Sequence, residues 1–309
     1  MNRILAIAGA LAVFTATASA KIERSVEKTF QVQPGVQLKV STSGGDIHVS
    51  SSNDPVVKVV AKERIRSGSE AEADEVLKKL DLKIEQSGNT VEATSSYEST
   101  MGFHFGGNPV EVDFVVTVPS SASVDLKTSG GDVVVGNLEG AVRAHTSGGD
   151  IKLDSIGGEV DATTSGGNVV LNEGRGSVRL STSGGNVSAE RVVGPASLKT
   201  SGGDIKVESV ENTLVAETSG GDVRAGFSGA LKGDCKLSTS GGQVKAIVGK
   251  GVGFQLDAST SGGEVDASGV TITIDHGGMG KSDLAGEVNG GGPLLKLRSS
   301  GGDIKVVVR

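Results

Sequence analysis

A three-residue motif, SerGlyGly, recurs at regular spacing along the chain. Its copies begin at Ser43, Ser129, Ser147, Ser165, Ser183, Ser201, Ser219, Ser240, Ser261 and Ser300. From Ser129 to Ser219 the spacing is 18 residues, and the next two steps are 21 residues each. Self-similarity at a fixed period is typical of folds in which each repeat is one structural unit that packs on its neighbours. The repeat is therefore the main constraint on the fold.

Within each unit, apolar residues alternate with polar ones on both sides of the GlyGly pair. The unit that starts at Ser123 is SVDLKTSGGDVVVGNLEG, with Val124 and Leu126 before the glycines and Val133 and Val135 after them. Alternation with a period of two predicts β-strands that bury one face. Each unit is therefore expected to form two short strands, joined by a GlyGly corner and closed by a second turn.

The corner residues explain the glycine content of 48 in 309 residues, about twice the usual share. We expect the glycines to give the corner access to positive φ without a Cβ clash. The Asp or Asn that follows each pair is expected to bond its own backbone and stabilise the turn.

Two architectures fit this unit. GlyGly between alternating runs is a strong hairpin signal, and hairpins in series would give an antiparallel β-meander. Alternatively, each unit is one coil of a parallel β-solenoid (β-helix), in which residue n stacks on residue n+18 at about 4.8 Å. Stacking like on like explains an unbroken threonine column: Thr128, Thr146, Thr164, Thr182, Thr200 and Thr218. We therefore predict an all-β parallel solenoid of 18-residue coils, with the meander as the alternative.

The region from 53 to 122 breaks the period. It predicts a strand from Val56, a helix from Glu70 with acidic residues first and lysines last, a hairpin around Gly88, and a strand that ends at Pro119. We interpret this region as a small α+β cap over the N-terminal end of the stack, because an exposed sheet edge invites aggregation. An aromatic loop at 100–109, TMGFHFGGNP, is an alternative contact surface.

The first twenty residues resemble a secretory signal. Arg3 precedes an apolar run from Ile4 to Phe14, and small residues ending at Ala20 resemble a cleavage site. We expect the mature chain to lie outside the cytoplasm, in the periplasm or at the cell surface, without a membrane span. The predicted domains are a signal peptide at 1–20, the first strand repeat and the capping region with one short helix at 21–122, and the solenoid at 123–309.

Charge and chemistry exclude several function classes. The net charge of −7 removes the general attraction on which nucleic-acid binding depends. Cys235 is the single cysteine and fits a buried position, so neither a disulfide framework nor a multi-cysteine zinc site is expected. The histidines share no ligand spacing: His48, His104, His145 and His276. We predict no catalytic, cofactor-binding or metal-binding residues and no enzyme activity.

One column of acidic and amide residues has calcium binding as an alternative interpretation. The corner residues Asp132, Asp150, Asn168, Asn186, Asp204 and Asp222 recur every 18 residues. Glycine-rich nonapeptide solenoids coordinate calcium, but their repeat is half as long and carries a further glycine. Turn residues that stabilise the corner are therefore the favoured interpretation.

The sequence resembles a known family. The segment LKVSTSGGDIHV from Leu38, the stretch FVVTVPSSASVDLKTSGGDVVV and the ladder of TSGGD and TSGGN units are similar to the bacterial putative-adhesin family of β-strand-repeat proteins, a family of domains of unknown function. The resemblance implies a right-handed solenoid, an envelope or surface setting and an adhesin role. In that family the turn is often AsnGlyAsp, whereas this chain prefers GlyGlyAsp. The family pattern defines no catalytic or ligand residue.

We therefore expect a non-enzymatic exported scaffold, or adhesin-like protein, that presents a repetitive surface in the bacterial cell envelope to a protein or a glycan. The alternative is an envelope carbohydrate-binding or carbohydrate-active β-helix protein that uses the loop around Phe103 and Phe105.

Overall fold

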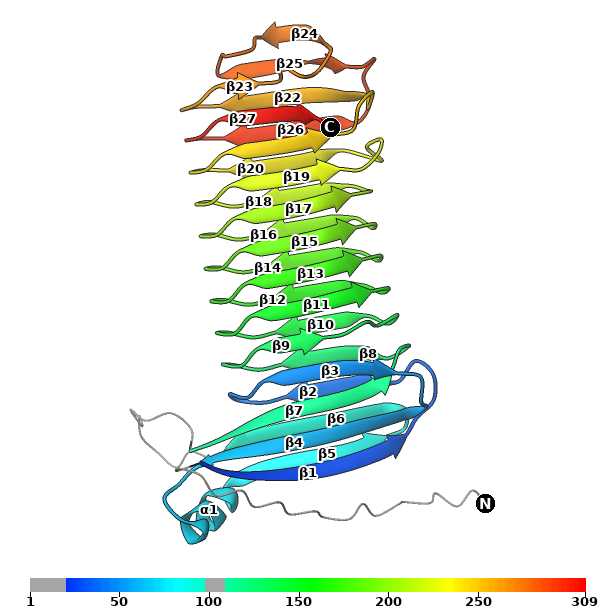
Figure 1. The fold of residues 1–309 in the computed structure, drawn as a ribbon, viewed down its shortest axis with the longest axis vertical. Helices are drawn as coiled ribbons and strands as arrows, with labels where there is room; N and C mark the ends of the chain where they lie inside the picture. The colour runs from blue at the N-terminus through cyan, green and yellow to red at the C-terminus, as the bar shows by residue number, and fades with distance from the viewer. Residues whose placement is uncertain (1–20, 98–108) are drawn as a thin grey trace.

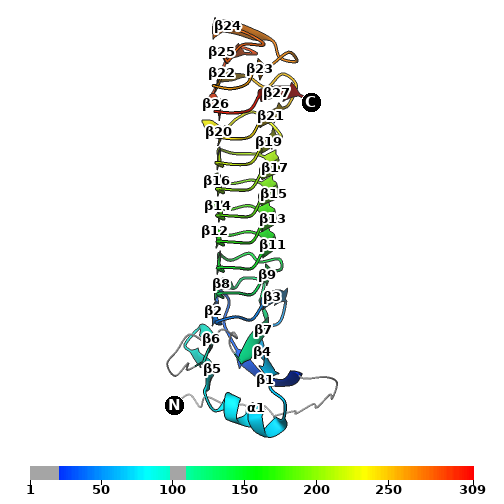
Figure 2. The same cartoon turned by 90° about the vertical axis from the view of Figure 1, so that its left-hand side faces the viewer.

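The fold is an elongated stack of β-coils (Figure 1). The structure, a computed structural model, describes residues 21–97 and 109–309. The signal segment 1–20 and most of the aromatic loop, including Phe103 and Phe105, lie outside the described residues. Strands dominate the rest, with one short helix in the described chain. They form two sheets that face each other along the length of the stack (Figure 2).

The central coils alternate between the two sheets. Strands of the 14-stranded sheet are β8 (Ser123–Lys127), β10 (Val142–His145), β12 (Val160–Thr163), β14 (Val178–Ser181), β16 (Ala196–Lys199), β18 (Leu214–Glu217) and β20 (Cys235–Thr239). Strands of the 13-stranded sheet are β9 (Val133–Val135), β11 (Ile151–Ile156), β13 (Val169–Gly174), β15 (Val187–Val192), β17 (Ile205–Val210), β19 (Val223–Phe227) and β21 (Val244–Val248).

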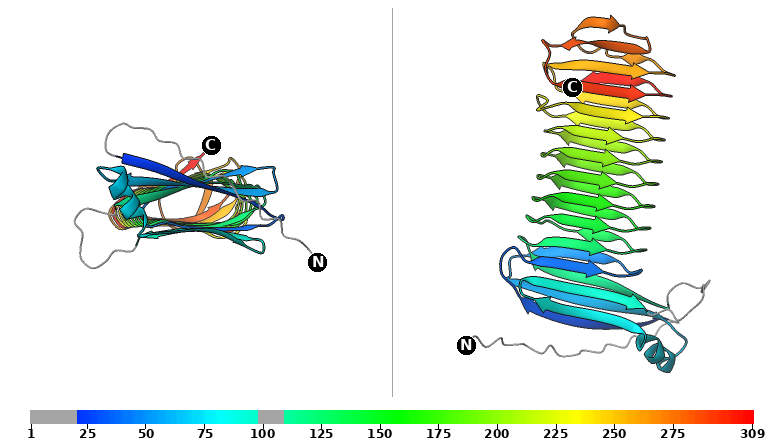
Figure 3. Two further views of the ribbon diagram at one scale, coloured as in Figure 1. Left: turned by 90° about the horizontal axis from the view of Figure 1, so that it is seen from below. Right: turned by 180° about the vertical axis from the view of Figure 1, so that it is seen from behind.

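Neighbouring strands in each sheet are parallel and one repeat apart. Val142 lies between Val124 and Val160, and Ile151 lies between Val133 and Val169. The chain rises in a right-handed coil, since the strands of each sheet run left to right when that sheet faces the viewer (Figures 1 and 3). The predicted solenoid is therefore confirmed, and the antiparallel meander is wrong for these coils.

The corner glycines serve close packing rather than unusual backbone angles. The glycines with positive φ lie elsewhere, at loop positions such as Gly35 and Gly88, so our sequence-based reason for the GlyGly pairs is wrong. A Cβ atom on Gly149, the second glycine of its pair, would overlap the carbonyl oxygen of Gly131 in the preceding coil. Glycine is required there because the corner backbones of successive coils lie in direct contact.

Buried threonines connect each corner to the coil before it. The Thr146 hydroxyl donates to the carbonyl oxygen of Gly131 at 2.9 Å and accepts from the Gly149 N–H at 3.3 Å. The same pattern recurs along the stack with Thr128, Thr164, Thr182, Thr200 and Thr239. The column thus satisfies polar backbone groups that the thin aliphatic core would otherwise leave unpaired.

The N-terminal end departs from sequence order. Its elements are β1 (Lys21–Gln31), β2 (Gln37–Ser41), β3 (Ile47–Ser52), β4 (Val56–Arg66), α1 (Glu70–Leu77), β5 (Leu80–Ser87), β6 (Thr90–Tyr97) and β7 (Val110–Pro119). The coil β2–β3 lies between β6–β7 and β8–β9. The SerGlyGly copy at Ser43 therefore joins the central column although β4, α1, β5, β6 and β7 separate it from the next copy in the sequence.

The cap contains the two strands, the helix and the hairpin that the sequence predicts, and in addition β1, which was not predicted. β1 and β4 extend one sheet with antiparallel pairing, and the hairpin β5–β6 extends the other. The helix ends at Leu77, so Lys78 caps it and no lysine lies in its last turn, contrary to expectation. The domain division at residue 122 stays a prediction.

The C-terminal end also departs from sequence order. Its strands are β22 (Phe254–Thr260), β23 (Val265–Asp266), β24 (Ile272–Gly277), β25 (Asp283–Val288), β26 (Leu294–Ser299) and β27 (Ile304–Val308). The last coil, β26–β27, lies between β20–β21 and β22–β23, and the antiparallel pair β24–β25 continues one sheet beyond β22 (Figure 1). Residue n therefore does not stack on residue n+18 at either end, because a later or earlier segment fills that level.

Candidate functional site

The acidic corner column forms a hydrogen-bonded ladder. Oδ1 of Asp132 accepts from the N–H of Asp150 at 2.8 Å, and Oδ1 of Asp150 accepts from the N–H of Asn168 at 2.7 Å. Each side chain thus bonds the backbone of the next coil, and the prediction that it bonds its own backbone is wrong. In the part of the chain that the structure describes, no group of three or more His, Cys, Asp or Glu residues is placed to hold a metal ion. These contacts support the turn-stabilising interpretation of the column.

Cys235 lies in the aliphatic core, as the sequence predicts. Its side chain is buried, and burial raises the pKa of the thiol. A raised thiol pKa leaves little thiolate at neutral pH, and the residue packs as a small core side chain. Three histidines lie on separate strands: His48 on β3, His145 on β10 and His276 on β24. His104 lies outside the described residues.

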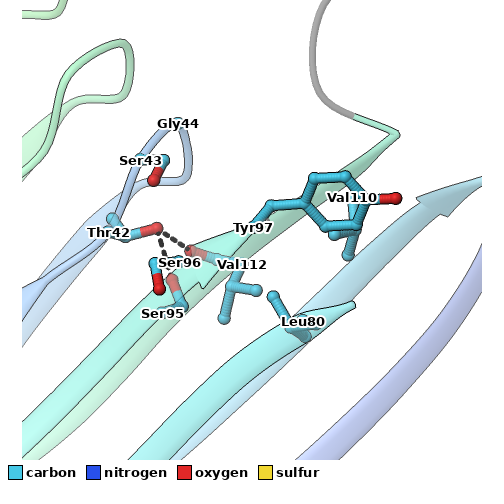
Figure 4. A pocket seen from close by; sticks show the side chains of 9 residues that line it. All are labelled: Thr42, Ser43, Gly44, Leu80, Ser95, Ser96, Tyr97, Val110 and Val112. Atoms are coloured by element: carbon cyan, nitrogen blue, oxygen red, sulfur yellow. Dashed lines mark hydrogen bonds between the residues drawn. The ribbon is translucent and has the colours of Figure 1, made fainter. Parts of the chain in front are cut away.

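One small pocket lies beside the first SerGlyGly corner (Figure 4). The Ser95 hydroxyl donates to Oγ1 of Thr42 at 2.9 Å, and the Thr42 hydroxyl donates to the carbonyl oxygen of Val112 at 3.0 Å. Tyr97 and Leu80 line its other side. It encloses about 10 Å³, which is room for about one water molecule. The pocket is far smaller than a site for an organic ligand, which takes roughly 300 Å³ or more.

Glu63 is a buried carboxyl group in the cap. It occupies an inward-facing position of β4, between the buried residues Ala61 and Ile65. Burial raises the pKa of Glu63, and the positive charge of Arg24 on β1 partly offsets this effect. Above its ordinary pKa, the unfolded chain releases this proton more readily than the folded chain does, so the group opposes folding as pH rises.

Glu63→Gln is therefore expected to raise the midpoint of thermal unfolding at neutral pH. The gain should shrink as pH falls and vanish below 4.5, the ordinary value for the group, because both folded and unfolded chains then carry the proton. Thermal scans across this pH range measure the effect, and Glu159→Gln, at an exposed turn, is the matched control. An unchanged or lower midpoint at neutral pH would contradict this account of Glu63.

The outer face of the 14-stranded sheet balances its charges along the stack. One column runs Asp125, Arg143, Asp161 and Arg179, so that each charge lies opposite the other sign on the next strand. Further along, Glu217 accepts from Lys199 at 2.9 Å and from Lys236 at 2.6 Å. Opposite charges on adjacent strands stabilise a sheet modestly. The charge pattern of the face from β8 to β20 is therefore explained by the stability of the stack.

The outer face of the 13-stranded sheet carries a different pattern. Four cationic residues occupy one column on consecutive strands: Lys206, Arg224, Lys245 and Lys305. We call this column the basic ladder. Lys305 joins it only because the last coil lies next to β21, so the sequence order hides the ladder. The sequence pattern that indicates the ladder is Val or Ile followed by Lys or Arg directly after the corner.

The sequence profile of a single family spans most of the chain. The profile of the Toastrack DUF4097 family matches residues 53–307. The chain belongs to this family. The resemblance to a family of adhesin-like domains of unknown function is thereby confirmed, and the two-sheet stack is the Toastrack fold of this chain. No curated protein matches the Toastrack chain.

Several solved structures are similar over nearly their whole length. A putative adhesin from Parabacteroides distasonis is 13% identical, with a TM-score of 0.49, and the match covers 92% of this chain and 97% of that chain. A putative adhesin from Parabacteroides merdae is 13% identical, with a TM-score of 0.46 and coverage of 92% and 96%. A protein described as a putative lipid binding protein, also from Parabacteroides distasonis, is 11% identical, with a TM-score of 0.36 and coverage of 92% and 96%. With TM-scores below 0.5, these likenesses add nothing to the family assignment.

The described Toastrack chain has no helix that could cross a membrane, since α1 is a single helix of eight residues.

Proposed function

We propose that this Toastrack protein is a non-enzymatic scaffold, adhesin-like in character, that presents its repeated outer surface to a partner in the bacterial cell envelope. The observation that carries the proposal is the regularity of the two outer faces. Each coil displays its outward side chains at the same positions, about 4.8 Å from those of the next coil. Such a surface suits an extended partner that makes the same contact many times, either a protein or a glycan.

The distribution of reactive groups supports the non-enzymatic part of the proposal. Along the described coils, the Asp and Asn side chains of the corners accept from backbone N–H groups, and many charged side chains of the outer faces are engaged in ion pairs, such as Glu217 with Lys199 and Lys236. Catalysis needs acid, base or nucleophilic groups that converge on one point.

The location outside the cytoplasm is part of the same proposal. It rests on the signal-like segment 1–20, whose apolar run and small residues before Lys21 are typical of exported proteins. Fractionation of the producing cell into cytoplasm, periplasm, outer membrane and medium tests it. Recovery of the intact, unprocessed chain from the cytoplasm would contradict export.

Binding of the purified protein to envelope fractions and to a glycan array tests the function. We expect saturable binding with no change in the bound glycan, measured by mass spectrometry of the recovered material. Turnover of a glycan would overturn the non-enzymatic proposal. Loss of glycan binding in a Phe103→Ala, Phe105→Ala variant would instead place the contact on the aromatic loop and favour the carbohydrate-active alternative.

A further inference from the structure

The basic ladder places like charges directly opposite one another. Arg224 on β19 pairs with Lys206 on one side and Lys245 on the other, and Lys245 also pairs with Lys305. Like charges in directly opposed positions destabilise a sheet. The other sheet alternates Asp and Arg from Asp125 to Arg179 and opposes only one pair of cations along its central strands, Lys236 and Lys296, where Glu217 lies 2.6 Å from Lys236. The ladder therefore does not serve the stability of the stack, and its role is to be sought in binding.

Carboxylates neutralise only the ends of the ladder. Lys206 pairs with Glu208 at 2.6 Å, and Lys305 pairs with Asp266 at 3.3 Å. Within residues 21–97 and 109–309, Arg224 and Lys245 form no ion pair. Nε of Arg224 is also buried without a hydrogen-bond partner in this part of the chain. The middle of the ladder thus carries two cations whose charge is not balanced by a contacting carboxylate.

The residue types in the neighbouring outward column change from polar and acidic to glycine and aliphatic beside the ladder. Two residues after the ladder position, successive strands carry Asp154, Asn172, Glu190, Glu208, Gly226, Ile247 and Val307. The polar and acidic run ends at Glu208, and glycine and aliphatic residues replace it beside Arg224, Lys245 and Lys305. On the other side, the corner residues Asp222, Gln243 and Asp303 are exposed, and Oδ1 of Asp222 accepts from the Gln243 N–H at 2.7 Å. The ladder is therefore open to an anion from the aliphatic side.

We propose that the basic ladder binds a linear polysaccharide that carries carboxylate or sulfate groups along its length. This inference rests on the proposed function and names the class of partner. The cations follow the long axis of the stack at a spacing of about 4.8 Å, which is similar to the length of one sugar unit in an extended chain. An anionic chain laid along the axis can therefore contact successive cations, while its sugar rings lie over Ile247 and Val307.

The same surface suits other polyanions less well. Single-stranded nucleic acids bind through aromatic side chains on which bases stack, and the outward positions of β17, β19, β21 and β27 carry none. A membrane surface calls for apolar anchors that enter the lipid. Ile247 and Val307 are half-buried, so they present little apolar surface to lipid.

Labelled polygalacturonate, with heparin as its sulfated counterpart, tests the inference in a fluorescence anisotropy titration of the full-length protein. Arg224→Gln with Lys245→Gln is expected to weaken binding about tenfold and to make its salt dependence shallower. The matched control is Arg143→Gln with Arg179→Gln, which removes two outward cations from the other sheet and should leave the affinity unchanged. Thermal unfolding should show no loss of stability in the ladder variant, because it removes like-charge contacts.

The outcomes separate this inference from the proposed function. Equal loss of binding in both variants, or no loss in either, would overturn the ladder as the site. Binding of single-stranded DNA or of anionic lipid vesicles in place of both polysaccharides would overturn the partner class. If envelope material binds normally to the ladder variant, the inference fails while the scaffold proposal stands. If the ladder binds the polysaccharide and the protein cleaves that polysaccharide, the inference stands and the non-enzymatic proposal fails.

Discussion

Gly149→Ala is expected to destabilise the protein much more than the same substitution at the adjacent Gly148. A Cβ on Gly149 would overlap backbone atoms of Gly131, and backbone cannot move aside without shifting a whole coil. A Cβ on Gly148 would lie 3.5 Å from the carbonyl oxygen of Gly130, which is an ordinary contact. Overpacking of this kind costs about 3 kcal/mol of unfolding free energy. Urea denaturation of the two variants measures the difference.

Comparing the two variants separates the effect of close packing on stability from the effect of backbone conformational freedom. Neither glycine has positive φ, so both substitutions are compatible with the local backbone angles. Equal effects at the two positions would show that the direct contact between corner backbones is not the reason for the second glycine. A large effect at Gly149 alone would show that the contact between coils requires the second glycine of each pair.

A chain that ends at Gly292 is expected to lose the order of residues 254–288. β22 reaches the stack only through β26, and β23 reaches it only through β27. Without the last coil, these segments face an empty level, while the coils up to β21 keep their own neighbours. In a stack of repeats each coil is stabilised mainly by the coils next to it, so the loss should stay local.

Hydrogen exchange measured by mass spectrometry follows this change. Amides of β22 and β25 should exchange at nearly the rate of an unfolded chain in the shortened protein, and amides of the coils up to β18 should stay protected. If β22 and β25 kept their protection, they would have to pack directly on β20 and β21, and the position of the last coil would be wrong.

Much of the fold follows from local pattern. The alternation of Val142 and Ala144 with polar residues specifies a strand with one buried face, and identical columns specify parallel stacking because like residues then meet. The cap strands β4 to β7 and the burial of Cys235 follow from the same alternation, whereas β1 was not predicted. These features depend on a few neighbouring residues, so the sequence carries them directly.

Three features depend on contacts between coils that the local sequence does not specify. The role of Gly149 depends on a neighbour one coil away, and turn chemistry alone predicted the wrong reason. The position of each end coil in the stack depends on which segments lie on either side of it, and no residue near Ser43 or Ser300 specifies those neighbours. The basic ladder follows from the second of these, since Lys305 meets Lys245 only through the placement of the last coil.

Amine footprinting of the full-length protein tests most directly the claim that the protein acts through an outer face. The protein is acetylated at its lysines with and without polygalacturonate, and the modified peptides are quantified by mass spectrometry. We predict protection of Lys206, Lys245 and Lys305, with Lys199 and Lys236 on the opposite sheet equally reactive in both samples. Protection confined to cap lysines such as Lys62, or equal on both sheets, would contradict the account.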